Sequence, residues 1–192
     1  MTDMRWLTTD EQLTWRLYME TTRLLFDALD RQLQADAGLS LADYEILVRL
    51  SEAPQHRLRM SDLAAATLYS RSRLSHAVSR LESAGWVRRE ECPQDKRGLF
   101  AVLTAGGYDK LAAAATGHVT TVRHLLVDQL GANQMRQLTG ICSALRENLD
   151  DTRRGGAAPA GAAAAGAAGA AGGSGEGGAT EAGAGDGAPT AC

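Results

Sequence analysis

Residues 70–107 read SRSRLSHAVSRLESAGWVRREECPQDKRGLFAVLTAGG, and the hydrophobic period of this stretch changes twice. Its first part begins with Ser70, a helix-capping residue type, and predicts an amphipathic helix whose inward stripe is Leu74, Ala77, Val78 and Leu81. After Gly85, two β-prone runs, WVRREE and GLFAVLT, flank the turn-forming segment CPQDKR, so a β-hairpin is predicted. Thr104 is expected to cap the helix that follows.

The other segments before about residue 151 are predicted to be helical. Apolar spacing indicates a long helix over residues 10–37 that stops at Gly38, and a second helix that is capped by Ser40 or Asp43 and ended by EAPQ. A short helix begins at Ser61, with Leu63, Ala64 and Leu68 turned inward. Two more helices are expected over about 104–130 and 133–151. The fold class is therefore mainly α with a small β-hairpin (α+β).

The order helix, turn, helix and hairpin, over about residues 43–103, is that of a winged helix-turn-helix, in which the hairpin is the wing. The flanking helices, over about 10–37 and 104–151, carry apolar stripes that the small central unit cannot cover alone. We therefore expect them to be dimerisation helices of a single domain that spans residues 1–154. A monomeric helical bundle that buries the same stripes internally is the alternative.

Composition limits the function further. Residues 155–192 are almost entirely glycine and alanine and are predicted to be a disordered tail, because burial cannot offset their ordering entropy. All 20 Lys and Arg residues precede this tail and three of the 23 acidic residues lie in it, so the body has no formal net charge. Residues 57–97 nevertheless hold nine basic residues against five acidic ones. With no secretory signal and no long apolar run, a cytoplasmic protein without membrane contact is expected.

The outward face of the helix that begins at Ser70 is rich in arginine and serine, and no carboxylate occurs on it before Glu82. A DNA major groove admits such a helix: arginine can grip guanine O6 and N7 with two hydrogen bonds, and serine or histidine can reach phosphates or base edges. An ordinary solvated face is the alternative, although such faces commonly mix Glu with Lys at i and i+4. The residues of this face are Arg71, Ser72, Arg73, Ser75, His76, Ser79 and Arg80.

The predicted hairpin turn, QDKRG, places two cations, Lys96 and Arg97, at a thin tip where Gly98 leaves backbone room. An arginine there can enter the narrow, negatively polarised minor groove while the helix occupies the adjacent major groove. Asp95 is expected to hold that arginine rather than contact DNA, because phosphate repels a carboxylate. A hairpin that is charged only for solubility is the alternative.

The stretch from Asp62 to Gly107 resembles the winged helix of MarR-type (multiple antibiotic resistance) regulators in its RLESAGWVRR join, its DKR wing tip and its LTAGG helix start. The order of helices extends this likeness over about residues 10–151. The resemblance implies a ligand-responsive repressor that binds a pseudo-palindromic double-stranded DNA operator as a homodimer. It also implies major-groove positions for Arg71, Ser72, Arg73, Ser75 and His76, with backbone contacts expected for Ser70, Ser79 and Arg80. The DNA-binding wing is expected to consist of Asp95, Lys96 and Arg97, with Arg97 as the minor-groove arginine and Asp95 as the wing acid that holds it.

The same resemblance implies a small aromatic or phenolic effector in the crevice between the dimerisation helices and the winged helix, with no cofactor and no metal. Five residues could supply a stacking surface and an anion-pairing guanidinium there, namely Trp15, Arg16, Tyr18, Tyr44 and Arg49. Ordinary core aromatics and surface arginines are the alternative for this set.

Two other functions, catalysis and protein interaction, have less support in the sequence than DNA binding. An enzyme is not expected, because only His124 and Asp128 share a helix face and neither a phosphate loop nor a metal-ligand spacing accompanies them. A winged helix that serves as a protein-interaction module stays open as the alternative to DNA binding.

Cys142 lies on an apolar stripe and is expected to be a packed core residue, whereas Cys92 at the base of the wing is the better redox candidate.

Overall fold

The computed structural model describes residues 4–92, 95–153 and 155, except for the side chains of residues 95–97. The chain divides into two compact units, Met1–Gln129 and Leu130–Cys192. The predicted disordered tail, 155–192, lies outside the described residues apart from Gly155. Among the described helices, none has the length and apolar character to cross a membrane.

Helix α1 (Thr9–Ala37) has clear signals at both ends. Thr8 accepts a hydrogen bond from the backbone N–H of Glu11, and the Glu11 carboxylate accepts one from the N–H of Thr8 at 2.7 Å. This reciprocal capping box satisfies donors that the first helical turn leaves unpaired. Gly38 ends the helix at φ 60°, a left-handed conformation that favours glycine, and the predicted stop is thereby confirmed.

Helices α2 (Leu41–Glu52), α3 (Met60–Thr67) and α4 (Arg71–Ser83) follow, and the last two form the predicted helix-turn-helix. Ser40 caps α2 and Ser70 caps α4, each through its side-chain oxygen. Both helices therefore begin where the capping residue types indicated, because a serine hydroxyl can accept a hydrogen bond from an N–H of the first turn.

The prediction that Leu68 points inward is wrong. This residue ends α3 in the left-handed conformation at φ 58°, and its side chain is 67% exposed. Thr67 is buried instead, and its hydroxyl donates to the carbonyl of Leu63 at 2.8 Å. The helical period stops before Leu68, because the chain must reverse direction there to begin α4.

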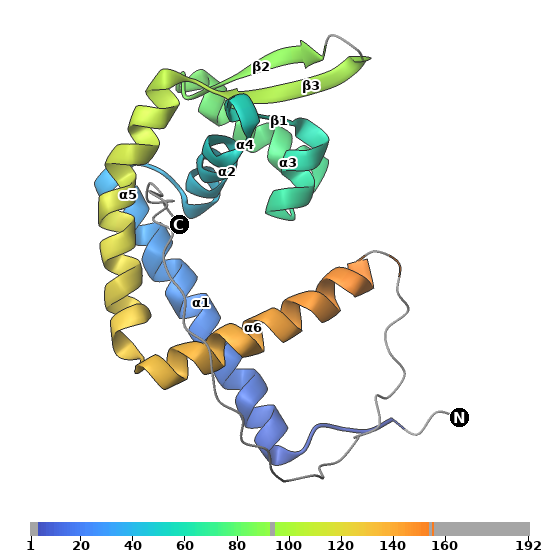
Figure 1. Cartoon of the computed structure of the whole chain (residues 1–192), viewed down its shortest axis with the longest axis vertical. Coiled ribbons are helices and arrows are strands. Elements are labelled where there is room, and N and C mark those ends of the chain that lie inside the picture. The colour runs from blue at the N-terminus through green and yellow to red at the C-terminus, as the bar shows by residue number, and fades with distance from the viewer. Residues whose placement is uncertain (1–3, 93–94, 154, 156–192) are drawn as a thin grey trace, which may run out of the picture. The chain divides into compact units, whose positions relative to one another are not determined.

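A three-stranded antiparallel sheet has the order β1–β3–β2, with β1 at Arg57–Arg59, β2 at Val87–Cys92 and β3 at Asp95–Leu103 (Figure 1). Strands β2 and β3 form the predicted hairpin. Its turn is shorter than predicted, because Asp95 already pairs with Cys92 and the backbone of the next two residues continues β3. Strand β1 escapes the sequence pattern, since it is only three residues long and follows a 3₁₀ turn, η1 (Pro54–His56).

One hydrophobic core joins these elements. The predicted inward stripe of α4 is confirmed, because Leu74, Ala77, Val78 and Leu81 are each at most 3% exposed. Removal of this apolar surface from water is the main force that holds α4 against the unit. The other buried members include Leu33 of α1, Ile46, Leu47 and Leu50 of α2, Leu63 of α3, and Val87 and Ala101 of the sheet.

Helix α5 (Ala105–Leu125) follows β3, packs beside α1 and is capped by Thr104 as predicted (Figure 1). It ends earlier than expected, because Leu126 leaves helical geometry at φ −129° and a 3₁₀ turn, η2 (Val127–Gln129), takes over. The predicted single helix to about residue 130 is therefore wrong in its last turn.

Several apolar side chains of α1 and of α6 (Ala132–Arg153) are left uncovered. In α6, all of which is described, no residue is buried, and Ile141 and Leu149 are 57% and 61% exposed. Cys142 is exposed as well, so its predicted place in a packed core is wrong for the single chain. In α1, before its buried residues Leu29 and Leu33, more than half of the surface is exposed for Leu13, Leu17, Tyr18, Leu24 and Phe26.

The start of α5 is fastened to the turn between α4 and β2. The Thr104 hydroxyl accepts the N–H of Gly107 at 3.0 Å and lies 2.8 Å from the carbonyl oxygen of Gly85, to which it can donate. Gly107 lies so close to Trp86 that an added Cβ would overlap the Trp86 carbonyl oxygen. Gly85 itself has φ 77°, which favours glycine. The AGW and LTAGG segments therefore form one structural joint.

Gly107→Ala is expected to destabilise the protein by about 1–3 kcal/mol, because the methyl group has to displace backbone rather than a flexible side chain. Thermal unfolding of the full chain measures the loss. Gly106→Ala is the matched control, since its Cβ would have no neighbour closer than 3.8 Å and alanine favours a helix. Equal unfolding temperatures for the two variants would contradict the close approach.

Candidate nucleic-acid interface

The N-terminal turn of α4 is built by its cap. The Ser70 hydroxyl accepts the backbone N–H of Arg73 at 3.2 Å, and the hydroxyl of Ser72 lies 3.2 Å from the same oxygen. Ser70, which the resemblance assigns to the DNA backbone, thus first serves the helix. The cap orients the residues that follow it, because it fixes where the helix begins.

The structure exposes every residue that was predicted on the outward face of α4, and the residues between them are buried. No described element covers this face. The exposed set is Arg71, Ser72, Arg73, Ser75, His76, Ser79 and Arg80.

Arg80 is held by the protein itself. Its guanidinium lies 2.9 Å from the carboxylate of Asp43 in α2, and the side chain is still 59% exposed. Asp43 also accepts a hydrogen bond from the Ser40 hydroxyl at 2.7 Å. The charge of Arg80 is therefore partly balanced within the chain, and its predicted role at the DNA backbone stays a prediction.

Arg89 of β2 binds α4 at several points, and sequence reasoning did not assign it a site role. Its guanidinium lies 2.6 Å from the Glu82 carboxylate and donates to the Ser75 carbonyl and the Ser79 hydroxyl, both at 3.0 Å. Its backbone N–H also donates to Glu82 at 3.1 Å. The side chain is only 22% exposed. Strand alternation could have signalled this contact, because Val87 and Arg89 share one face of β2 and Val87 is buried.

Arg71 and Arg73 differ from these two arginines. Among the described residues, neither forms an ion pair with a carboxylate, and both are exposed near the start of α4. The Arg73 guanidinium lies over the ring of Tyr69, with its Cζ 4.3 Å from the ring centroid. The structure therefore leaves two uncompensated cations on the part of α4 that is nearest its N-terminus.

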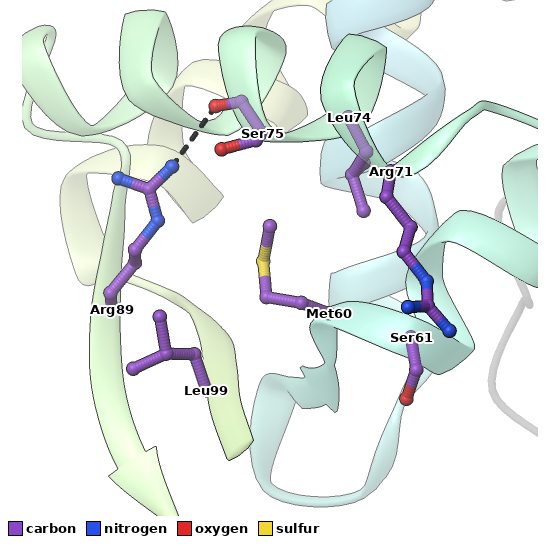
Figure 2. A pocket seen from close by; sticks show the side chains of 7 residues that line it. All are labelled: Met60, Ser61, Arg71, Leu74, Ser75, Arg89 and Leu99. Carbon is purple, nitrogen blue, oxygen red and sulfur yellow. Dashed lines mark hydrogen bonds between the residues drawn. The ribbon is translucent and has the colours of Figure 1, made fainter. Parts of the chain in front are cut away.

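A pocket of about 250 Å³ lies between α4, the start of α3 and the hairpin. Figure 2 shows Arg89 on one wall, directed at Ser75, and Arg71 on the opposite wall beside Ser61. Apolar side chains complete the lining, namely Met60, Leu74 and Leu99. Because Arg89 is already paired with Glu82, Arg71 is the cation of this lining that has no carboxylate partner among the described residues.

The side chains of the predicted DNA-binding wing, Asp95, Lys96 and Arg97, lie outside the described side chains, although their backbone is part of β3. Their roles stay predictions. Nearer the body of the sheet, Arg57 and Arg59 of β1 lie over the ring of Phe100, at 5.0 and 5.6 Å from its centroid. These contacts fix two cations on the sheet by cation–π attraction.

Cys92 is buried, with 2% of its surface exposed, and its Sγ accepts a hydrogen bond from Arg59 at 3.2 Å. A thiol reacts with an oxidant only when the oxidant can reach it. The burial of Cys92 and its bond to the side chain of Arg59, which reaches it from β1 across β3, therefore support a packing role rather than a reactive thiol.

The five predicted effector residues are not gathered around one described pocket. Tyr44 is buried and its ring lies 4.5 Å from that of His118 in α5, whereas Trp15 and Tyr18 contact one another on the exposed part of α1. Arg16 and Arg49 are exposed. A second pocket, of about 400 Å³, is lined by other residues: His56, Leu103, Thr104, Ala105, Tyr108 and Asp109. The effector site stays a prediction.

The pKa values of Tyr44 and of the neighbouring His118 shift for the same reason. Burial raises the pKa of the Tyr44 hydroxyl and lowers the pKa of the His118 imidazole, because both charged forms lose hydration. Burial therefore favours the neutral form of the His118 imidazole. His124 and Asp128, which were expected to share one helix face, lie in different elements. Asp128 lies in η2, where its carboxylate is 2.6 Å from the guanidinium of Arg123.

A family model described as MarR family matches residues 37–98, which run from the end of α1 into the hairpin. Transcriptional repressor MprA of Escherichia coli strain K12 is 27% identical over 146 residues, which cover 76% of this chain and 82% of MprA.

Solved structures extend the likeness to almost the whole described chain. Sco3205, a MarR family transcriptional regulator from Streptomyces coelicolor in complex with DNA, is 53% identical, with a TM-score of 0.73 and coverage of 76% of this chain and 92% of that one. AbsC, another MarR family regulator from the same organism, is 47% identical, with a TM-score of 0.72 and coverage of 77% and 99%. With so many identical residues along nearly the full length of two members, on the same winged-helix scaffold, this chain belongs to the MarR family of transcriptional regulators.

Proposed function

We propose that this protein is a sequence-specific, double-stranded DNA-binding transcriptional regulator whose helix α4 enters the major groove. The observation that carries the proposal is the exposed first turn of α4, where Arg71 and Arg73 have no carboxylate partner among the described residues. Arg80 and Arg89, by contrast, are paired with Asp43 and Glu82. The solved complex of Sco3205 with DNA supports the same assignment.

The chemistry of this turn suits base recognition. A reading helix contacts base edges mainly with its N-terminal residues, and a guanidinium can donate two hydrogen bonds to guanine. Ser72 and Ser75 offer hydroxyls on the same exposed face, and His76 offers a ring nitrogen. Two uncompensated cations favour DNA over a protein partner, because the phosphate backbone of any duplex attracts them.

We also propose a homodimer in which the uncovered apolar stripes of α1 and α6 bury one another across a two-fold axis. The support is the exposure of side chains such as Phe26, Ile141 and Leu149, each more than half exposed in the single chain. Exposed apolar area on this scale marks an interaction surface. A two-fold dimer presents two copies of α4, which suits a pseudo-palindromic operator.

The proposed regulatory action is repression that a small aromatic or phenolic effector relieves, in the cytoplasm where the operator is accessible. MprA, a relative that is named a transcriptional repressor, supports repression. An effector acts only through the difference between its affinities for two dimer conformations that hold the reading helices at different spacing. Trp15, Arg16, Tyr18, Tyr44 and Arg49 remain the residues proposed to bind it.

Arg73→Ala should lower discrimination between the operator and altered sequences by about 1–3 kcal/mol, if the guanidinium makes a bidentate contact with guanine. DNA selected from a random pool, followed by affinity measurement on single base-pair changes, tests this. Arg80→Ala is the control, because Asp43 holds that guanidinium and its loss should leave base preference intact. Unchanged base preference in Arg73→Ala would contradict the proposed reading helix.

Arg97→Ala should weaken binding to all sequences by a similar factor, because a minor-groove or phosphate contact carries little base information. The salt dependence of the affinity should also become shallower by about one unit of slope. Titration of one operator and one unrelated duplex at several salt concentrations measures both effects. An affinity equal to that of the parent protein would exclude a wing contact by Arg97.

Ile141→Glu combined with Leu149→Glu should shift the protein to monomer and abolish operator binding, because two buried carboxylates cannot be paired in the proposed interface. Sedimentation gives the mass, and footprinting of the parent protein should show two half-sites about 10 bp apart. Glu147→Gln, which removes a charge from an exposed residue off this stripe, is the control. A parent protein that is already monomeric would contradict the dimer.

A further inference from the structure

The side chain of Arg73 is the one uncompensated arginine of α4 that rests on an aromatic ring. Its Cζ lies 4.3 Å from the centroid of Tyr69, inside the range in which a ring face attracts a cation. No ring contact is seen for Arg71 among the described residues, and its side chain borders the pocket beside Ser61. The two arginines therefore reach the same surface with different freedom.

Tyr69 is itself fixed, and its position in the chain explains why. It immediately precedes Ser70, the cap of α4, and its backbone N–H donates to the Ala64 carbonyl at 3.1 Å. The ring is half-buried and packs against the hydrophobic core. The backbone and the ring of Tyr69 are therefore held by the turn between α3 and α4.

The hydroxyl end of the ring has a partner on a third helix. Tyr69 donates to the carboxylate of Glu45 in α2 over 3.4 Å. Burial and the negative charge of Glu45 both raise the pKa of the Tyr69 hydroxyl, so it stays protonated and keeps its donor. The ring is thus tied to α2 at one end and to the cap of α4 at the other.

A free arginine side chain has many rotamers, and holding it in one of them on DNA binding costs free energy. A ring that already holds the guanidinium lowers that cost, because the side chain is ordered before DNA arrives. The effect acts on Arg73 only, since no other described arginine lies over the Tyr69 ring.

We propose that Tyr69 is a positioning residue that orients the Arg73 guanidinium for base reading, while Arg71 binds without such preparation. The inference rests on the proposed function. It divides the work of the two arginines: Arg73 supplies base preference from a fixed position, and Arg71 supplies attraction that any DNA sequence can receive.

The first test replaces the ring in the full-length protein. Tyr69→Leu should weaken operator binding roughly 2- to 12-fold, the range expected when one long side chain must be ordered during binding. Base preference should fall at the same base pair that Arg73→Ala affects, and affinity for an unrelated duplex should stay unchanged. Tyr69→Phe keeps the ring and should keep the preference, which a role for the hydroxyl alone would not allow.

Double-variant cycles separate positioning from a general structural effect. Tyr69→Leu should add no further loss to Arg73→Ala, because the ring then has no guanidinium to orient. The same change in an Arg71→Ala background is the matched control and should cost as much as it does in the parent protein. Additive losses with Arg73→Ala would overturn the proposal.

A shape-preserving series guards against poor folding of Tyr69→Leu. Replacement of Tyr69 with phenylalanines that carry one, two or three ring fluorines weakens the negative ring face at nearly constant size. Operator affinity should fall stepwise along this series, with equal unfolding temperatures. Constant or rising affinity would overturn the positioning role, since it would mean that the ring is irrelevant or stores Arg73 away from DNA.

The two proposals fail in different ways. If Arg73→Ala loses base preference and the Tyr69 variants do not, the positioning role is wrong and the reading helix stands. If Arg73→Ala keeps its preference, the proposed reading contact is wrong, and the role of Tyr69 is overturned with it.

Discussion

The close approach of Gly107 to the Trp86 carbonyl is the constraint on which the functional geometry depends. At this joint α4 has just ended, the hairpin begins, and the first turn of α5 lies against the turn between them. Thr104 adds its contacts to the same turn, so that the chain before and after the hairpin is fastened at one point. A side chain at position 107 would push the start of α5 away from the winged helix. The orientation of α4 relative to α5 is therefore set by a contact that only glycine permits.

A second feature, the pairing of arginines, decides which cations of the winged helix are available. Asp43 and Glu82 bind Arg80 and Arg89 and use them to join α4 to α2 and to the hairpin. Within α4, the arginines without a carboxylate partner among the described residues are Arg71 and Arg73, both near its first turn. The ion pairs of Arg80 and Arg89 therefore stabilise the unit, whereas Arg71 and Arg73 keep their charge for a partner outside the chain.

The sequence predicted those parts of this structure that have a local signal. The stripe of α4, the caps at Ser40 and Ser70, the stop at Gly38 and the hairpin all follow from period or residue type within a few positions. Leu68 and the end of α5 were misjudged, because the apolar spacing continues past the point where the backbone leaves the helix. Strand β1 and the bonds of Arg89 depend on partners many residues away, and a pattern along the chain does not contain them. Cys142 was expected in a packed core because it lies on an apolar stripe, but no residue of α6 is buried in the single chain.

The bonds of Arg89 have a mechanical consequence. They join β2 to the middle and the end of α4 through a backbone carbonyl, a hydroxyl and a carboxylate at once. Helix α4 and the base of the hairpin are therefore joined by side-chain bonds as well as by the turn between them. A displacement of one has to displace the other or break the bonds of Arg89 to Ser75, Ser79 and Glu82.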